Sequence, residues 1–200
     1  MATIADIQTL VVQRTGRPEL VALTRTAIRT ATLRAHHTDF FPRDGIRQFL
    51  EYPIDGSKVF ADISDLYTAM PTLRAVKTVY CVDFSSGLPI ERLDFRTIGD
   101  EYDHEGRLRQ SIFVIHGTMR IYPRVQSGKI QVIGFANPTV SDATFSSWIA
   151  DSYPEEIAAW ASAIVLQRTG SLEQAQVLQR DFVIPFKEML VESHLLAGIN

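Results

Sequence analysis

The side chains that could bind a metal ion gather in two short segments of the chain. In the first, His36, His37 and Asp39 offer imidazole and carboxylate ligands at the end of a helical pattern. Adjacent side chains at a helix end point in different directions, so they do not readily share one ion. The pattern favours a polar helix terminus, where cationic histidines complement the carbonyl end of the helix. We therefore predict neither a metal nor a cofactor.

The second segment is acidic and has the sequence DEYDHEG at residues 100–106. Asp100, Glu101, Asp103 and Glu105 carry the oxygen atoms that calcium prefers. Their spacing does not match the EF-hand loop, which has a fixed ligand order. This mismatch favours a solvated acidic loop between strands.

Catalytic motifs are absent from the sequence. It contains no glycine-rich nucleotide loop, no Gly-x-Ser-x-Gly elbow and no His-Glu-x-x-His pair. Cys81 lies within a β-rich run, which indicates a buried, apolar-like thiol. Asp62 and Asp65 are expected at the surface, because nothing pairs them as acid and base. We therefore predict that the chain is not an enzyme.

Three aromatic residues surround the predicted start of a helix. Trp160 falls within an apolar stripe of helical period, which predicts a core position. Trp148 precedes that stripe in a connector, and Tyr153 lies between them. Exposed aromatic side chains often anchor interfaces, so Trp148 remains open between core and interface.

The composition is that of a globular domain. The chain has 200 residues, of which 46% are apolar and 22% charged. No apolar run approaches the roughly 18 residues of a membrane-spanning helix, and we expect no signal peptide in MATIADIQTLVVQR. A single cysteine excludes an internal disulfide and fits a reducing compartment.

Charge is distributed unevenly along the chain. Residues 1–50 hold seven arginines and four acidic residues, a net charge of +3, whereas the remainder carries −6. Arginine makes bidentate contacts with carboxylates and phosphates. The arginine-rich start is therefore either a surface for an acidic partner or an ordinary solvated helix face. The overall charge of −3 disfavours a dedicated nucleic-acid-binding module.

Helical signals mark the N-terminal end. Thr3 with Asp6 predicts a capped first helix, and Gly16 predicts its end. Pro18 predicts the start of a second helix.

Helical signals return in the last third of the chain. Pro154 predicts a helix start, and Gly170 predicts that helix's end. Ser171 with Gln174 predicts a capping box for a further helix. Pro185 must kink or end that helix, because proline lacks a backbone donor and clashes with the preceding turn.

The middle of the chain has β character. We predict strands over 58–64, 75–84, 111–116, 118–122 and 129–135. Short turns separate the last three, which predicts an antiparallel meander.

This layout predicts an α+β fold. Its helical bundle core would be built from the N- and C-terminal helices, with an inserted antiparallel β meander or sandwich. Neither helix pair buries its apolar stripe alone, so the two pairs must pack together. We expect an N-terminal helical hairpin over 1–39, an inserted β domain over 40–140 and C-terminal helices over 141–200.

The segment from Tyr122 to Gly170 resembles the head-to-tail adaptor proteins of tailed bacteriophages, which bind the portal. The resemblance rests on a strand ending at Tyr122-Pro123, an aromatic return strand over Phe135–Pro138 and the connector SSWIADSYPEEI. The long C-terminal helix (SLEQAQVLQRDF) and the N-terminal ATIADIQTLVVQRTG are also similar to this family. Residues 40–110 depart from the pattern, so the resemblance leaves the role of the β insertion open.

The resemblance implies a structural virion protein of the neck, assembled in the host cytoplasm. Such adaptors form a homo-oligomeric ring, typically of twelve copies, between the portal protein and a tail or nozzle protein. Double-stranded DNA passes through the ring without sequence-specific binding, and no membrane is involved. An alternative is another neck or tail ring protein, such as a tail terminator. A further alternative is a small ligand-binding or enzymatic α+β domain with a concave pocket.

Three surfaces follow from this interpretation. A ring needs two different complementary faces on each subunit, and the expected residues are Arg25, Arg29, Glu155, Glu156 and Glu173. The segment after Pro185 is the expected portal-docking arm, with Phe186, Met189, Leu190, Leu195, Leu196 and Ile199. The alternative is that this arm covers the chain's own core. The expected tail-side contacts are Asp100, Glu101 and Asp103.

Overall fold

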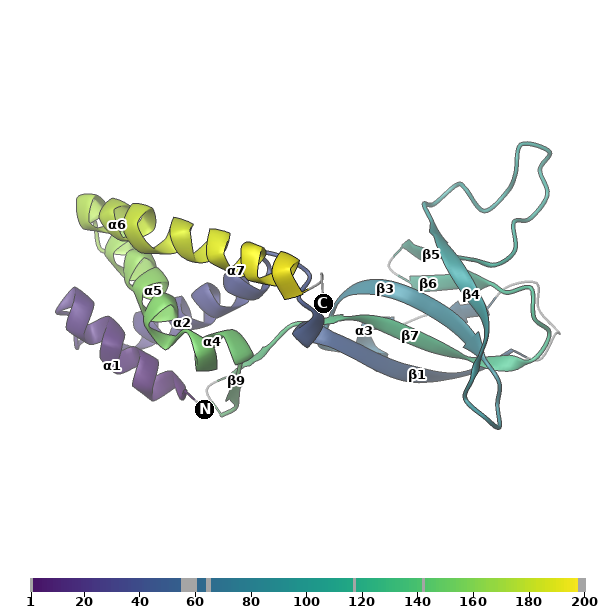
Figure 1. Ribbon diagram of the computed structural model, residues 1–200, viewed down its shortest axis with the longest axis horizontal. Helices are drawn as coiled ribbons and strands as arrows, with labels where there is room; N and C mark the ends of the chain where they lie inside the picture. Colours follow the sequence, from purple (N-terminus) through teal and green to yellow (C-terminus); the bar gives the residue numbers. More distant parts are fainter. Residues whose placement is uncertain (1, 55–60, 64–65, 117, 142, 198–200) are drawn as a thin grey trace. The chain divides into compact units, whose positions relative to one another are not determined.

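The computed structural model describes residues 2–54, 61–63, 66–116, 118–141 and 143–197. The chain divides into two compact units (Figure 1). Residues 1–44 and 137–200 form the helical unit, and residues 45–136 form the sheet unit. Helices and a β-sheet are both present, so the predicted α+β class is confirmed. The sequence pattern predicted the ends of the first and second segments at residues 39 and 140, whereas the structure has them at 44 and 136.

The helical unit takes its elements from both ends of the chain. Its helices are α1 (Ile4–Thr15), α2 (Val21–His36), the 3-10 turn η1 (Pro42–Asp44), α4 (Trp148–Ser152), α5 (Pro154–Arg168), α6 (Leu172–Leu178), the π-helix η2 (Gln179–Val183) and α7 (Ile184–Ala197). Two short strands, β8 (Thr139–Val140) and β9 (Phe145–Ser146), pair with each other.

The predicted N-terminal signals are confirmed at the first helix. Thr3 and Asp6 form a capping box, and Gly16 ends α1 in the left-handed conformation at φ 64°. The second helix begins later than predicted. Pro18 lies in a turn, closed by a hydrogen bond from the Leu20 amide to the Arg17 carbonyl at 3.3 Å. The turn takes up the residues that the proline signal assigned to the helix.

The C-terminal signals are confirmed only in part. Pro154 occupies the start of α5, as predicted. Ser171 precedes α6 but makes no side-chain cap, so the capping box with Gln174 is wrong. Pro185 lies in the first turn of α7, and the α-helical geometry is interrupted just upstream by η2. A π-helical turn there is the local irregularity expected where the proline ring would meet the Asp181 carbonyl.

Helix α5 contributes most to the core of the helical unit. Every residue from Ile157 to Leu166 is buried, including Trp160, which confirms its predicted core position. Ile28 of α2 and Leu190 of α7 belong to the same apolar cluster, so both ends of the chain supply one core. No helix in the described part of the chain combines the length and apolar character needed to cross a bilayer.

The sheet unit contains a curled, mixed sheet. Its strands are β1 (Gly45–Ile54), β2 (Ala61–Ile63), β3 (Leu73–Val82), β4 (Pro89–Arg96), β5 (Ile112–His116), β6 (Thr118–Tyr122) and β7 (Gly128–Ala136). Their order is β1-β7-β3-β4-β5-β6-β2, and the short helix α3 (Leu66–Ala69) follows β2 in the chain. Of the strand predicted over 58–64, residues 61–63 form β2, and the remainder lies outside the described residues.

The predicted antiparallel meander is wrong in its pairing. Strands β5 and β6 are antiparallel, as expected, but β7 pairs with β1 and β3 instead of β6. Strands β4 and β5 are parallel, which makes the sheet mixed. At Gly134 the Ala75 carbonyl lies so close that a Cβ would clash, so glycine permits the approach of β7 to β3.

The apolar side of the sheet holds Cys81, Val79 and Val132 in one buried cluster. Cys81 is fully buried, so the predicted apolar-like thiol is confirmed. Burial, and secondarily the charge of Glu91, raises the pKa of this thiol to about 12. The thiol therefore stays protonated and unreactive at neutral pH.

Candidate functional site

The arginines predicted for the ring interface are not fully exposed. Arg25 and Arg29 are half-buried on α2. The Arg25 Nε atom donates a hydrogen bond to Gln8 Oε1 at 3.1 Å. Because α2 packs against α1, Arg25 finds a partner inside the helical unit.

The acids predicted to meet those arginines are in three different settings. Glu155 is paired within the chain, because Arg14 Nη2 lies 2.6 Å from its Oε2. Glu156 is half-buried, and Glu173 is exposed at the start of α6. Of the five predicted ring residues, Glu155 and Glu173 are exposed, and Glu155 is already paired with Arg14.

The predicted docking arm is divided between core and surface. Phe186 and Leu190 are 3% and 0% exposed and belong to the core of the helical unit. Their burial agrees with the alternative that this part of the arm covers the chain's own core. Met189 and Leu195 are 36% and 62% exposed. The Leu196 side chain and Ile199 lie outside the described residues.

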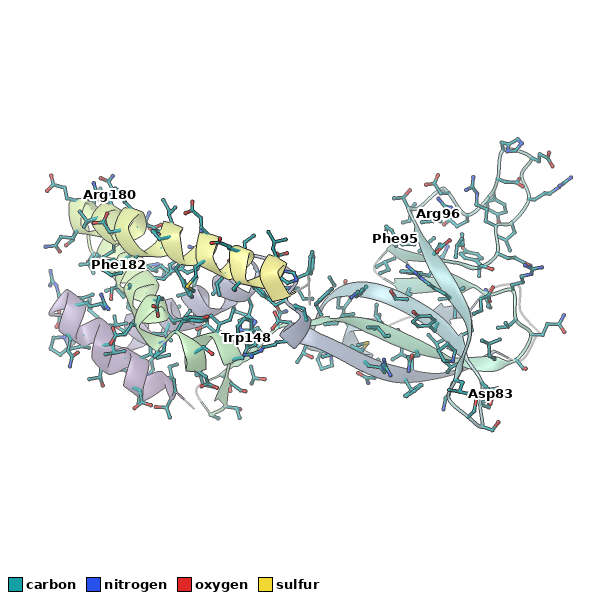
Figure 2. The ribbon with its side chains drawn as sticks, in the orientation of Figure 1. Asp83, Phe95, Arg96, Trp148, Arg180 and Phe182 are labelled. Carbon is teal, nitrogen blue, oxygen red and sulfur yellow. The ribbon has the colours of Figure 1, made fainter. Side chains whose placement is uncertain are left out.

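The exposed apolar surface begins earlier than the arm. It extends over α6, η2 and α7 and has six members: Leu172, Val177, Phe182, Ile184, Met189 and Leu195. We call this set the C-terminal apolar surface. Phe182 (Figure 2) also receives the Arg14 guanidinium, whose carbon lies 5.4 Å from the ring centre.

The acidic loop uses its carboxylates to hold its own backbone. Asp103 accepts hydrogen bonds from the amides of Glu105 and Arg107 at 2.9 and 2.8 Å. Glu101 accepts one from the Gly99 amide at 2.7 Å, and Asp100 is bonded to the Thr97 hydroxyl. The three acidic residues predicted to contact the tail therefore stabilise the turns of their own loop.

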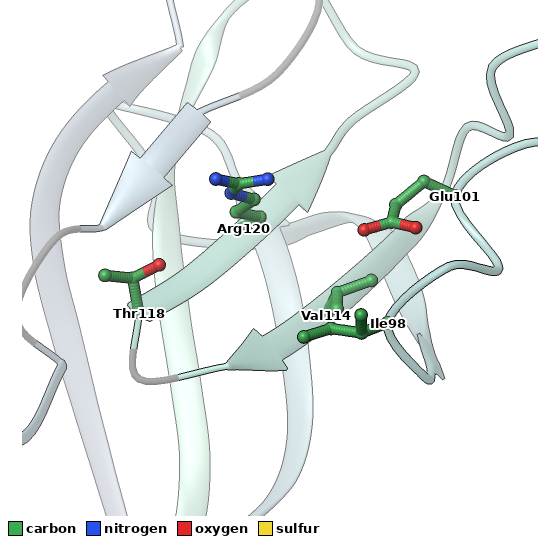
Figure 3. Close-up of a pocket in the computed structure, with 5 residues that line it drawn as sticks. All are labelled: Ile98, Glu101, Val114, Thr118 and Arg120. Carbon is green, nitrogen blue, oxygen red and sulfur yellow. The ribbon is translucent and has the colours of Figure 1, made fainter.

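A small cavity of about 180 Å³ lies beside this loop (Figure 3). Ile98, Glu101, Val114, Thr118 and Arg120 surround it, and Figure 3 shows Glu101 approaching from the loop while Arg120 projects from β6. One acid and one base line it, so it carries no net charge. It is smaller than the roughly 300 Å³ at which ligand pockets begin.

A second polar arrangement, which the sequence did not reveal, surrounds His36. Its Nδ1 lies 2.9 and 3.0 Å from the two carboxylate oxygens of Asp44, and its Nε2 lies 2.9 Å from the Ser147 hydroxyl. The Trp148 indole donates to Asp44 Oδ1 at 2.9 Å. We call these four side chains the His36 network. Trp148 is thus half-buried and tied into the helical unit.

The His36 network has the connectivity of a serine–histidine–aspartate triad, but it is sealed. His36, Ser147 and Asp44 are 2%, 3% and 7% exposed. The Ser147 hydroxyl also caps α4 by accepting the Ala150 amide at 3.1 Å. A nucleophile needs room for substrate within about 3 Å, and this burial leaves none. The network therefore acts as a structural tie between Asp44, just before β1, and Ser147.

The neighbouring histidine ties a different segment. His37 is exposed, and its Nε2 lies 2.7 Å from Asn137 Oδ1, at the point where the chain re-enters the helical unit after β7. Asp39 instead meets His194 Nδ1 at 2.8 Å. The three residues that the sequence grouped as possible ligands thus point to three different partners. Among the described residues, no group of three or more histidines, cysteines or acids could hold a metal ion.

Comparison with known proteins gives no assignment. The chain matches no family model, and no curated protein matches it significantly.

Proposed function

We propose that the chain is a structural virion protein, a head-to-tail adaptor whose copies form a ring beneath the portal and continue the DNA channel. The observation that supports this most directly is the C-terminal apolar surface, with six apolar side chains at least 36% exposed on one helical run. Exposed large apolar side chains that gather on one segment often mark a protein–protein interface. The other side of the same run is anchored in the core through Phe186 and Leu190.

Anchoring on one side and exposure on the other suits a ring subunit. A ring contact must be rigid, because each interface repeats around the ring and a loose angle would prevent closure. The channel must also let DNA slide, so phosphate should not be bound tightly along its wall. The net charge of −3 is compatible with that requirement.

The assembly state tests this proposal. We expect native mass spectrometry and negative-stain electron microscopy to show rings, either of the chain alone or with the portal protein from the same genome. Leu195→Ser and Met189→Ser should weaken the ring without unfolding the subunit. Leu88→Ser is the matched control, because Leu88 is 66% exposed, belongs to the sheet unit and is not a member of the C-terminal apolar surface.

Two results would contradict the proposal. One is a chain that stays monomeric both alone and with the portal. The other is a ring that the two helix variants leave unchanged. A ring that forms but ignores the portal and binds the end of a tail tube would identify the tail-terminator alternative.

A further inference from the structure

A cavity of about 370 Å³ opens on the helical unit beside the end of α2. Its lining comes from four parts of the unit: Arg34, His37 and Thr38 at the end of α2, Trp160 of α5, Gln179 of η2 and Lys187 of α7. Its volume falls within the range of small-molecule sites, which begins near 300 Å³. We call it the cationic cavity.

Arg34 and Lys187 give the cavity its charge, and none of the described residues that line it is acidic. Within the described part of the chain, no carboxylate lies within ion-pair distance of either cation. Two acidic residues that lie near the cavity residues in the sequence already have partners of their own. Asp39 meets His194 at 2.8 Å, and Asp181 meets Arg180 at 2.6 Å. The two positive charges of the cavity are therefore not neutralised by the chain itself.

Three of the residues around the cavity are held in place before any ligand arrives. The Lys187 ammonium lies 4.7 Å from the centre of the Trp160 ring, a cation–π contact that leaves its hydrogen atoms available. The His37 ring is fixed by Asn137 at 2.7 Å. The Thr38 hydroxyl donates to the Arg34 carbonyl at 3.2 Å. Preorganised donors lower the entropy lost when a ligand binds.

We infer that the cationic cavity binds a phosphate group. A guanidinium and an ammonium on different helices can each engage a separate oxygen, and the Gln179 amide adds a neutral donor from a third element. A phosphate presents several oxygen atoms in three dimensions, whereas a carboxylate presents two in one plane. A phosphate monoester near pH 7 also carries a charge of about −1.5 to −2, which matches the two unneutralised cations.

Two sources supply this chemistry: a small phosphate compound, and the phosphodiester backbone of a nucleic acid. The inference concerns the phosphate group itself. It does not rest on the proposed function, because a cavity within one subunit needs no ring.

Nuclear magnetic resonance of the two tryptophan indoles provides a direct test. Inorganic phosphate should shift the Trp160 indole signal saturably and leave the Trp148 signal unchanged, because Trp148 does not line the cavity. Binding should weaken as salt rises. The Arg34→Gln, Lys187→Gln double variant should bind phosphate at least tenfold more weakly. Lys187→Arg should retain binding, because it keeps the charge.

Arg168→Gln is the matched control, because Arg168 is an exposed arginine of α5 outside the cavity. A duplex DNA fragment and a phosphate monoester, titrated separately, distinguish the two sources. Both outcomes support the site: binding of the monoester alone indicates a small compound, and binding of both indicates a nucleic-acid backbone. The inference is overturned if phosphate gives no saturable shift, or if the double variant binds as well as Arg168→Gln. Thermal unfolding of each variant checks that the unit remains folded.

Discussion

Replacing His36 with alanine would remove the central member of the His36 network. Both ring nitrogens of His36 are hydrogen-bonded, one to Asp44 and the other to Ser147. The ring also packs edge-to-face against Trp148, with centroids 5.8 Å apart. The substitution therefore breaks two buried hydrogen bonds and opens a cavity at the same time.

The expected cost is the sum of these effects. Asp44 keeps the Trp148 indole and Ser147 keeps the Ala150 amide, so each loses one partner. The loss of one buried hydrogen bond costs about 0.5–1.5 kcal/mol at a neutral group such as the Ser147 hydroxyl and about 1.5–3 kcal/mol at a charged group such as the Asp44 carboxylate, and the lost ring adds a packing term. We expect His36→Ala to lower the free energy of unfolding of the helical unit by about 3–5 kcal/mol.

Tryptophan fluorescence during urea unfolding measures this change. The chain has two tryptophans, Trp148 and Trp160, and both lie in the helical unit. The transition midpoint and slope therefore report on that unit separately from the sheet unit. Far-ultraviolet circular dichroism before denaturation verifies that the variant is folded.

The adjacent histidine supplies a matched control. His37→Ala removes one exposed hydrogen bond, to Asn137, and should cost less than about 1 kcal/mol. Equal effects of the two substitutions would refute the reasoning. So would a His36→Ala variant within about 0.5 kcal/mol of the natural protein, the range of an ordinary surface change.

Three further results are expected. Leu190→Ala should destabilise the helical unit by about 2–5 kcal/mol and Leu195→Ala by less than about 0.5 kcal/mol in the same fluorescence assay; equal losses would contradict the two-sided account of α7. Cys81, with its pKa raised to about 12 by burial, should react with a thiol reagent only after unfolding; rapid labelling at pH 7 would show an accessible thiol. Hydrogen bonds from Ser85 and its neighbour hold the pKa of Asp83 well below 3.8. These bonds stabilise the loop above pH 3.8 and are lost only as the pH falls through the depressed pKa of Asp83. Nuclear magnetic resonance signals of the Ser85 and Ser86 amides that titrate with a midpoint at pH 3.8 would contradict this expectation.

Signals that act within one helical turn could be predicted from the sequence. The Thr3–Asp6 capping box, the left-handed Gly16 and the proline at the start of α5 each depend on neighbouring residues alone. The burial of Trp160 followed from its place in a stripe of helical period. These features need no knowledge of the rest of the fold.

Pairings between distant segments could not be predicted in the same way. The strand pattern identified β5, β6 and β7, but it could not show that β7 lies between β1 and β3. Strand partners are chosen by burial across the whole sheet, and periodicity within one strand does not specify them. The π-helix before Pro185 could not be predicted either. Proline disfavours a regular helix locally, but packing against the rest of the unit keeps the segment helical, and the irregular turn accommodates both.

The His36 network was missed although the sequence held a signal for it. Ile28, Thr32 and His36 are spaced four residues apart on α2, and all three are buried. Extending the apolar stripe by one turn would have placed His36 inside and His37 outside. The identity of its partners was not accessible, because Asp44 and Ser147 are brought together only by the tertiary fold.

The charges that remain available constrain how copies of the chain could meet. Arg25 is bonded to Gln8, Arg14 is paired with Glu155, and both arginines therefore serve their own subunit. The last helical run nevertheless exposes six large apolar side chains, interspersed with polar and charged ones. A ring built on those apolar side chains would depend on apolar burial, which salt does not screen. A ring built on arginine–glutamate pairs would weaken with salt, because the Debye length shortens from about 10 Å at 0.1 M salt to about 3 Å at 1 M. Persistence of the ring in 1 M salt would therefore favour the apolar interface. Dissociation of the ring in 1 M salt would favour the predicted arginine–glutamate interface.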